Sequence, residues 1–224
     1  MPPHVLIHVV TGGIAVLAGA IALTAPKGRP WHIGAGRTFV ITMLISAGVG
    51  AVMGLLTYHK HLIAFHAGVL ACYLVLSSWV SARRRAPSSY RGPPVILLAI
   101  VNLLNMAGLI AAGVTARSAD DGMLFTYHSD AYLFMAGLAL AGVIGDLHIL
   151  IRQTLSARSR IARHLWRMCV ALVLAAGSLF TGPGAKAFPD AVRASGILSI
   201  PEPVILLVMV FWLARTFWPS RRRA

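Results

Sequence analysis

Nine histidines are the residues of this 224-residue chain with the most distinctive chemistry. Histidine is uncommon in long apolar segments, and ionisable groups in membrane helices often mark ion, proton or cofactor sites. His4 and His8 are spaced i, i+4, so in a helix both rings project from one face and could bind one metal ion. His59, His61 or His128, at neighbouring helix ends, could supply a third ligand.

The histidines divide into two groups once the apolar segments are interpreted as membrane spans. Six lie on the side predicted to be outside, near Asp130: His4, His8, His59, His61, His66 and His128. His32, His148 and His164 lie on the predicted inner side with Asp146. The outer group predicts a transition-metal site or a haem b, for example between His8 and His66. The alternatives are interfacial histidines bonded to backbone and water, or proton coupling.

Two stacked haems fit this pattern poorly. His128 and His148 are the only histidines that one predicted helix carries in both groups. At 1.5 Å per residue they are about 30 Å apart, which places both near the membrane surfaces.

A basic segment on the predicted inner side surrounds one carboxylate. Arg160, Arg163, His164 and Arg167 fall within an arc of about 100° if the helix has begun there. Asp146, near the end of the preceding apolar run, needs a charged partner, so a salt bridge fixing this turn is expected. The functional alternative is an anion or lipid-headgroup site, with these candidate residues: Asp146, His148, Arg160, Arg163, His164 and Arg167.

Two amides are also placed within a predicted span. An unpaired Asn102 or Asn105 facing lipid would be costly, so both are expected to bond across helices. Lining a polar path is the alternative, and with Asp146 it would suit a small proton-coupled transporter.

Composition defines the elements that must position these residues. The chain is 58% hydrophobic and 12% charged, with a mean hydropathy of +0.77, which indicates an integral membrane protein. We predict an all-α bundle in a single domain, residues 1–224, with seven transmembrane helices at about 4–25, 38–58, 61–82, 95–116, 129–151, 161–180 and 203–217.

The basic residues predict the orientation of the chain. Sixteen of the 20 Lys and Arg residues follow the first, third, fifth and seventh helices. By the positive-inside rule the N-terminus lies outside and the C-terminus in the cytoplasm of a bacterium, across its inner membrane. The net charge of +14 then reflects topology and attraction to anionic lipid headgroups, not nucleic-acid binding. The oligomeric state stays open.

Three sequence stretches resemble a known family. The pattern Lys27-Gly28-x-x-x-His32-x-x-x-Gly36, with Gly145-Asp146-Leu147 and the segment RIARHLWRMC at 160–169, resembles bacterial multi-pass inner-membrane proteins of unknown function. The resemblance covers all seven helices and implies this class without an activity. Similar proteins carry Gly-Gln where this chain has Gly182-Pro183, so no role of that glutamine carries over.

The sequence therefore favours a metal- or haem-binding, redox-capable membrane protein. A small proton-coupled transporter or permease, and a non-catalytic scaffold or assembly protein, are the alternatives. No nucleophile–base pair, phosphate loop or zinc-protease motif is present in the sequence, which makes a conventional hydrolase or kinase a poor fit and leaves enzyme activity open.

Overall fold

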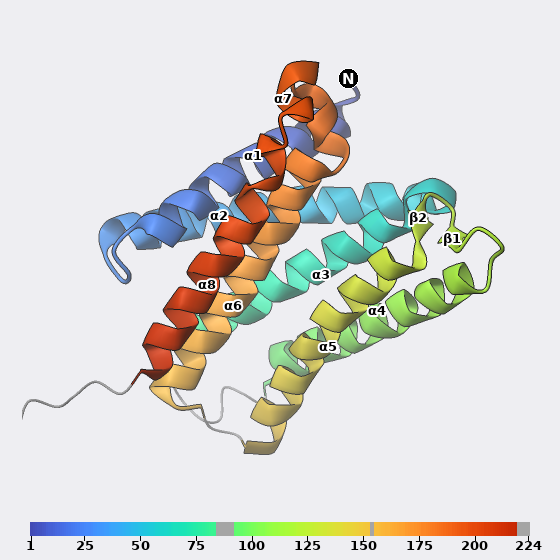
Figure 1. The fold of residues 1–224 in the computed structure, drawn as a ribbon. Coiled ribbons are helices and arrows are strands. Elements are labelled where there is room, and N and C mark those ends of the chain that lie inside the picture. Colours follow the sequence, from blue (N-terminus) through green and yellow to red (C-terminus); the bar gives the residue numbers. More distant parts are fainter. Residues whose placement is uncertain (84–91, 153–154, 219–224) are drawn as a thin grey trace, which may run out of the picture.

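The computed structural model describes residues 1–83, 92–152 and 155–218, which form a bundle of long helices (Figure 1). The long helices are α1 Pro3–Thr24, α2 Pro30–Leu56, α3 Tyr58–Arg83, α4 Pro93–Arg117, α5 Ser129–Arg152, α6 Ala157–Ala176 and α8 Pro201–Phe217. Between α6 and α8 lie a π-helix η2 Gly177–Thr181, two short 3₁₀ segments, η3 Pro183–Ala187 and η4 Ile197–Ser199, and the single-turn helix α7 Asp190–Ala194.

Seven helical segments in the described part of the chain are long and apolar enough to cross a membrane. Their outer faces carry large apolar side chains, such as Leu17, Leu104 and Leu207, which are 68%, 67% and 69% exposed. A contiguous apolar surface of this extent is unfavourable in water and is what a lipid-facing surface requires. The chain is a multi-pass helical membrane protein.

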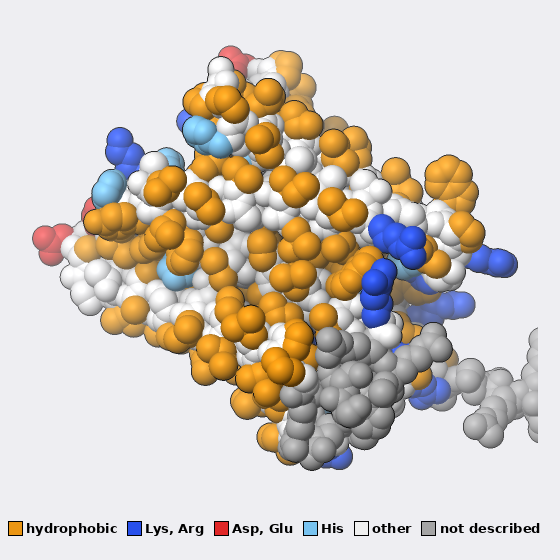
Figure 2. Space-filling model, turned by 180° about the vertical axis from the view of Figure 1, so that it is seen from behind, with side chains coloured by type: hydrophobic (Ala, Val, Ile, Leu, Met, Phe, Trp, Pro, Cys, Tyr) orange, Lys and Arg blue, Asp and Glu red, His pale blue; other side chains and the backbone are white. Residues whose placement is uncertain are grey.

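Charged side chains separate towards the two ends of the bundle. In Figure 2 most of the visible Lys and Arg gather at one end, Asp and Glu at the other, and apolar side chains between them. The end with the α1–α2 connection and the C-terminus of α8 is called the basic end below. The α2–α3 and α4–α5 connections lie at the opposite end.

α3 is the central helix of the bundle and packs on α2, α4 and α6 (Figure 1). The α4–α5 pair lies on one side of it, and α6 with α8 on the other. Glycines allow the closest approaches: a Cβ on Gly68 would lie 2.5 Å from the Ala47 carbonyl oxygen, and one on Gly54 2.4 Å from the Phe65 nitrogen. Small residues at helix contacts are the usual means of tight packing in lipid.

The predicted helix boundaries need several corrections. α2 begins at Pro30 rather than residue 38, because proline suits the first turn of a helix, so His32 is helical. α6 begins at Ala157, where Ser156 caps it through the Ser159 N–H. α3 continues through a distorted residue, His61, in place of the predicted turn. The predicted fourth loop contains a small hairpin, β1 Met123–Leu124 with β2 Tyr127–His128.

Candidate functional site

A buried ionic cluster joins α3, α5 and α6 near the basic end. Asp146 of α5 is 3% exposed and accepts hydrogen bonds from Arg163 and Arg167 of α6, the latter at 3.0 Å. Tyr73 of α3 donates to the other carboxylate oxygen at 2.6 Å. The Nε of Arg163 also donates to the Ser81 hydroxyl at 2.9 Å. The predicted pairing of Asp146 with arginines of this segment is confirmed for two of them.

The two arginines bridge a gap that the helix backbones do not close. α5 packs mainly on α4, whereas α6 packs on α3 and α8. Glycines on α5 make room for the guanidinium groups: a Cβ on Gly145 would lie 3.1 Å from an Arg163 nitrogen. Arg167 also donates to the Gly142 carbonyl oxygen at 3.1 Å. The side chains of Arg163 and Arg167 therefore connect α6 to α5.

The cluster carries one more positive than negative charge. Arg167 is fully buried, and its Nε and Nη1 find no acceptor among the described residues. Its guanidinium carbon lies 5.0 Å from the Tyr73 ring centre and 5.3 Å from that of Trp166. Aromatic faces attract a desolvated cation, which compensates in part for the missing acceptors. This arrangement links α3, α5 and α6 inside the bundle.

The two amides in α4 bond across helices, as expected from the sequence. Asn102 donates to the Ala139 carbonyl oxygen of α5 at 2.9 Å. Asn105 accepts from Nδ1 of His66 at 2.8 Å and donates to the His66 carbonyl oxygen at 3.3 Å. His66 is thereby fixed in the contact between α3 and α4.

The other predicted outer histidines do not gather around His66. His8 donates from Nδ1 to the Ser46 carbonyl oxygen of α2 at 2.8 Å, so it belongs to the α1–α2 contact. His4, His59, His61 and His128 are exposed. Within the described residues no three His, Cys, Asp or Glu side chains form a group that could hold a metal ion. The predicted outer metal or haem site stays a prediction.

The remaining predicted inner residues separate as well. Arg160 is half-buried and His148 exposed, whereas the side chains that bond to Asp146 in the described part of the chain are those of Tyr73, Arg163 and Arg167. His164 faces away from the ionic cluster, towards a cavity on the other side of α6. One helix thus presents arginines to α5 and a histidine to this cavity.

The cavity, called the basic pocket below, has a volume of about 680 Å³ at the basic end of the bundle. It is bounded by α1, the α1–α2 connection, α2, α3, α6 and α8, and its wall is mostly apolar. Among the described residues, three cationic side chains line it, Lys27, Arg37 and Arg83, and no acidic one does. Volume and lining are those of a ligand site with a few placed polar groups.

Two of the three motif stretches found in the sequence meet in this pocket. Lys27, Gly28, His32 and Gly36 line it from one side, and residues of the segment 160–169 line it from α6. A Cβ on Gly36 would meet no atom within 4 Å, so Gly36 opens onto free space. The spacing of the first motif therefore places four residues of α2 and its connection around one cavity.

Hydrogen bonds orient both histidines of the basic pocket. His32 lies 2.9 Å from the Ala22 carbonyl oxygen through Nδ1, and a carbonyl can only accept, so Nδ1 carries the hydrogen. Ser78 donates its hydroxyl hydrogen to the His164 carbonyl oxygen at 3.0 Å. Nδ1 of His164, 2.9 Å from the same hydroxyl oxygen, therefore donates to it. With the hydrogen on Nδ1, a neutral ring carries its lone pair on Nε2.

Lys27 has a double role at the pocket. Its ammonium donates to the carbonyl oxygens of Ala22, Leu23 and Ala25, which caps the C-terminus of α1. It also lies 4.9 Å from the centre of the Trp212 ring of α8. Burial lowers the pKa of Lys27 below its ordinary value of 10.5, although the nearby Cys169 thiol raises it.

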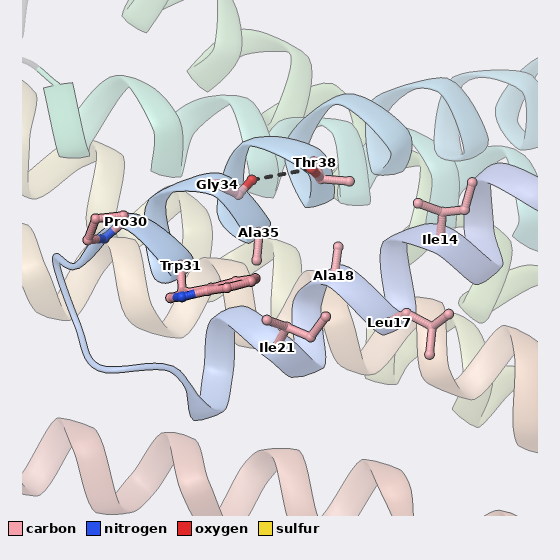
Figure 3. Close-up of a pocket in the computed structure, with 9 residues that line it drawn as sticks. All are labelled: Ile14, Leu17, Ala18, Ile21, Pro30, Trp31, Gly34, Ala35 and Thr38. Carbon is pink, nitrogen blue, oxygen red and sulfur yellow. Dashed lines mark hydrogen bonds between the residues drawn. The ribbon is translucent and has the colours of Figure 1, made fainter.

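A second cavity, of about 500 Å³, lies between α1 and α2 (Figure 3). Its labelled side chains are apolar except Thr38, whose hydroxyl donates to the Gly34 carbonyl oxygen at 3.3 Å. With no charged group, it offers no chemistry beyond contact with an apolar chain. The basic pocket is the better candidate.

No family model, curated protein or solved structure matches the chain. The resemblance to a bacterial membrane-protein family therefore stays a prediction.

Sequence reasoning did not single out the α3 residues that complete the cluster and the pocket. Tyr73, Ser77 and Ser81 are spaced by four, a polar stripe along an otherwise apolar helix, and Ser78 lies beside it. That periodicity was a signal for a buried polar contact. The roles of Arg37 and Arg83 had no such signal, because surface arginines at helix ends also follow from topology alone.

Proposed function

We propose that this chain is a bacterial inner-membrane protein that binds an amphiphile with an apolar body and an anionic end in the basic pocket. In this proposal the N-terminus lies outside and the basic end faces the cytoplasm. The observation that supports it most is the lining: an apolar cavity with Lys27, Arg37 and Arg83 and no acidic residue. An anion placed beside Arg37 and Arg83 would gain charge-assisted hydrogen bonds, and the ammonium of Lys27 would add electrostatic attraction.

The position of the pocket supports the same ligand class. At the basic end it would lie at the level of the cytoplasmic headgroups, where anionic lipids concentrate. The six acidic residues of the chain are not placed to neutralise the cations of the pocket. Asp146 is already paired with two arginines, and the other five belong to the predicted outer side. The pocket is the binding element; the buried cluster stabilises the helices around it.

The test is binding of cis-parinaric acid, a fluorescent fatty acid, against its uncharged methyl ester, with empty detergent micelles as the blank. The acid should bind at least tenfold more tightly, since one charge-assisted hydrogen bond contributes about 1.5–3 kcal/mol. Arg37→Gln should remove much of this preference. Arg158→Gln is the matched control, because Arg158 is exposed at the same end and does not line the pocket.

A second pair of variants tests the cavity itself. Gly36→Leu should fill the basic pocket and abolish binding, whereas Gly34→Leu should not, since Gly34 lines the other cavity. A Cβ at either glycine meets no atom within 4 Å, so both variants should fold. Equal binding of acid and ester, or binding unaffected by Gly36→Leu, would refute the proposal. Competition by inorganic phosphate would show that the anionic group alone is recognised.

A further inference from the structure

His32 and His164 both line the basic pocket, and the anionic-lipid proposal leaves them without a role. Nε2 of neutral His32 and His164 accepts hydrogen bonds or binds a metal, because each Nδ1 carries the hydrogen. A carboxylate or a phosphodiester also has only acceptor atoms, so it forms no hydrogen bond with the Nε2 of a neutral imidazole. A haem iron, in contrast, binds directly to the lone pair of an imidazole nitrogen.

The hydrogen bonds on Nδ1 are those expected behind a metal ligand. A metal-bound histidine almost always donates its other ring N–H to a carbonyl, carboxylate or water, which fixes the ring and raises its basicity. Here the Ala22 carbonyl oxygen accepts the hydrogen bond from His32, and the Ser78 hydroxyl oxygen accepts the one from His164. The rings come from separate helices, α2 and α6, that border the same cavity.

The rest of the pocket suits the other parts of a haem. A porphyrin needs an apolar wall, which Phe39, Trp79 and Leu172 supply. Its two propionates need cations, and Arg37 and Arg83 line the same cavity. Arg83 stacks on Trp79, with its guanidinium carbon 4.1 Å from the ring centre, which holds it beside the apolar wall.

We propose that the basic pocket binds a b-type haem, with His32 and His164 as iron ligands and Arg37 and Arg83 beside the propionates. This rests on the proposed function, because haem is one amphiphile with an apolar body and an anionic end. It assigns the haem to the predicted inner histidines rather than to the outer group.

The test is an absorption spectrum of full-length protein purified from cells supplied with δ-aminolevulinate, followed by hemin titration of any haem-free fraction. We expect about one haem per chain by pyridine haemochrome assay and a low-spin spectrum. His32→Ala and His164→Ala should each lower hemin affinity at least tenfold, and added imidazole should restore part of the low-spin spectrum. His148→Ala, exposed at the same end, is the matched control and should bind normally.

Ser78→Ala gives a milder variant that keeps both ligands. Loss of a hydrogen bond behind a metal ligand typically costs 10–100-fold in affinity, so this variant should bind hemin more weakly. If the alanine variants of the histidines do not fold, Ser78→Ala and the wild-type spectrum decide the question.

Two outcomes would overturn the proposal that the basic pocket binds haem. One is a colourless wild-type protein that hemin does not titrate, and the other is haem retained in both histidine variants. If parinarate still binds with preference over its ester, the proposed function stands and the haem inference fails. If neither parinarate nor hemin binds, both fail.

Discussion

Tyr73 of α3 donates a hydrogen bond of 2.6 Å to the Asp146 carboxylate of α5, although 73 residues separate them in the sequence. Both side chains are almost fully inaccessible to solvent. The bond helps to hold the α4–α5 pair against the central helix, together with the two arginines that bind the same carboxylate.

Tyr73→Phe should lower the free energy of unfolding by about 1–3 kcal/mol, because it leaves a carboxylate oxygen buried without its donor. Unfolding by SDS in mixed micelles measures this. Tyr58→Phe is the control, since the Tyr58 side chain is exposed at a helix end and its hydroxyl stays in contact with solvent. Equal stability of the two variants would contradict the assigned bond.

Asp146→Asn should be more damaging, by about 3–5 kcal/mol, because Arg163 and Arg167 would then be buried without a counter-ion. The same unfolding assay measures it. Asp130→Asn, at an exposed carboxylate, should change stability by less than about 0.5 kcal/mol. Adding Arg163→Gln to Asp146→Asn should recover part of the loss, since it removes one of two like charges. Additive losses in the double variant would show that the groups are not coupled.

The existence of the long helices was predictable because hydropathy over about 20 residues is a local property. The pairing of Asp146 was also predictable, because a carboxylate at that depth needs a cation and the arginine arc lies at the start of the next helix. The basic pocket was not predictable. It depends on α1 and α6 lying side by side and on His164 pointing away from its neighbours Arg163 and Arg167, which are facts of tertiary packing.

The predicted starts of two helices were too late, because each helix begins at a proline or a capping serine before its apolar run does. Pro30 is the first residue of α2, and Ser156 is the N-cap of α6. Both lie in polar stretches that hydropathy assigns to loops. As a result His32 was assigned to a loop, whereas the first turn of α2 holds it against the end of α1.

Gly68→Ala should destabilise the α2–α3 contact by about 1–3 kcal/mol, because the added methyl would lie 2.5 Å from a backbone oxygen and that backbone cannot move aside cheaply. Gly48→Ala is the matched control on α2, where a Cβ meets no atom within 4 Å. It should be neutral or slightly stabilising, since alanine suits a helix better than glycine. SDS unfolding of both variants makes the comparison, and a neutral Gly68→Ala would contradict the close packing.

The metal site predicted at the outer histidines can be tested independently of the proposed haem. If His4 and His8 bind a transition metal, elemental analysis should find stoichiometric metal beyond any haem iron, and His8→Ala should reduce it. His8→Ala also removes the bond to Ser46, so His4→Ala, at an exposed position, is the variant that tests ligation without that loss. A preparation without such metal would refute the outer site.

Binding of an anionic amphiphile should weaken at alkaline pH through Lys27. Burial lowers the pKa of its ammonium below 10.5, so this charge is lost at a lower pH than that of an exposed lysine. Parinarate is already ionised above pH 7. Its affinity should therefore fall by about two- to fivefold as the pH rises through the pKa of Lys27, which is the effect expected for the loss of one exposed charge pair. Lys27→Arg should remove the decline because it keeps the charge, and Lys27→Met should bind weakly at every pH. Fluorescence titrations from pH 7 to 10.5 measure this, and a decline that persists in Lys27→Arg would assign it to another group.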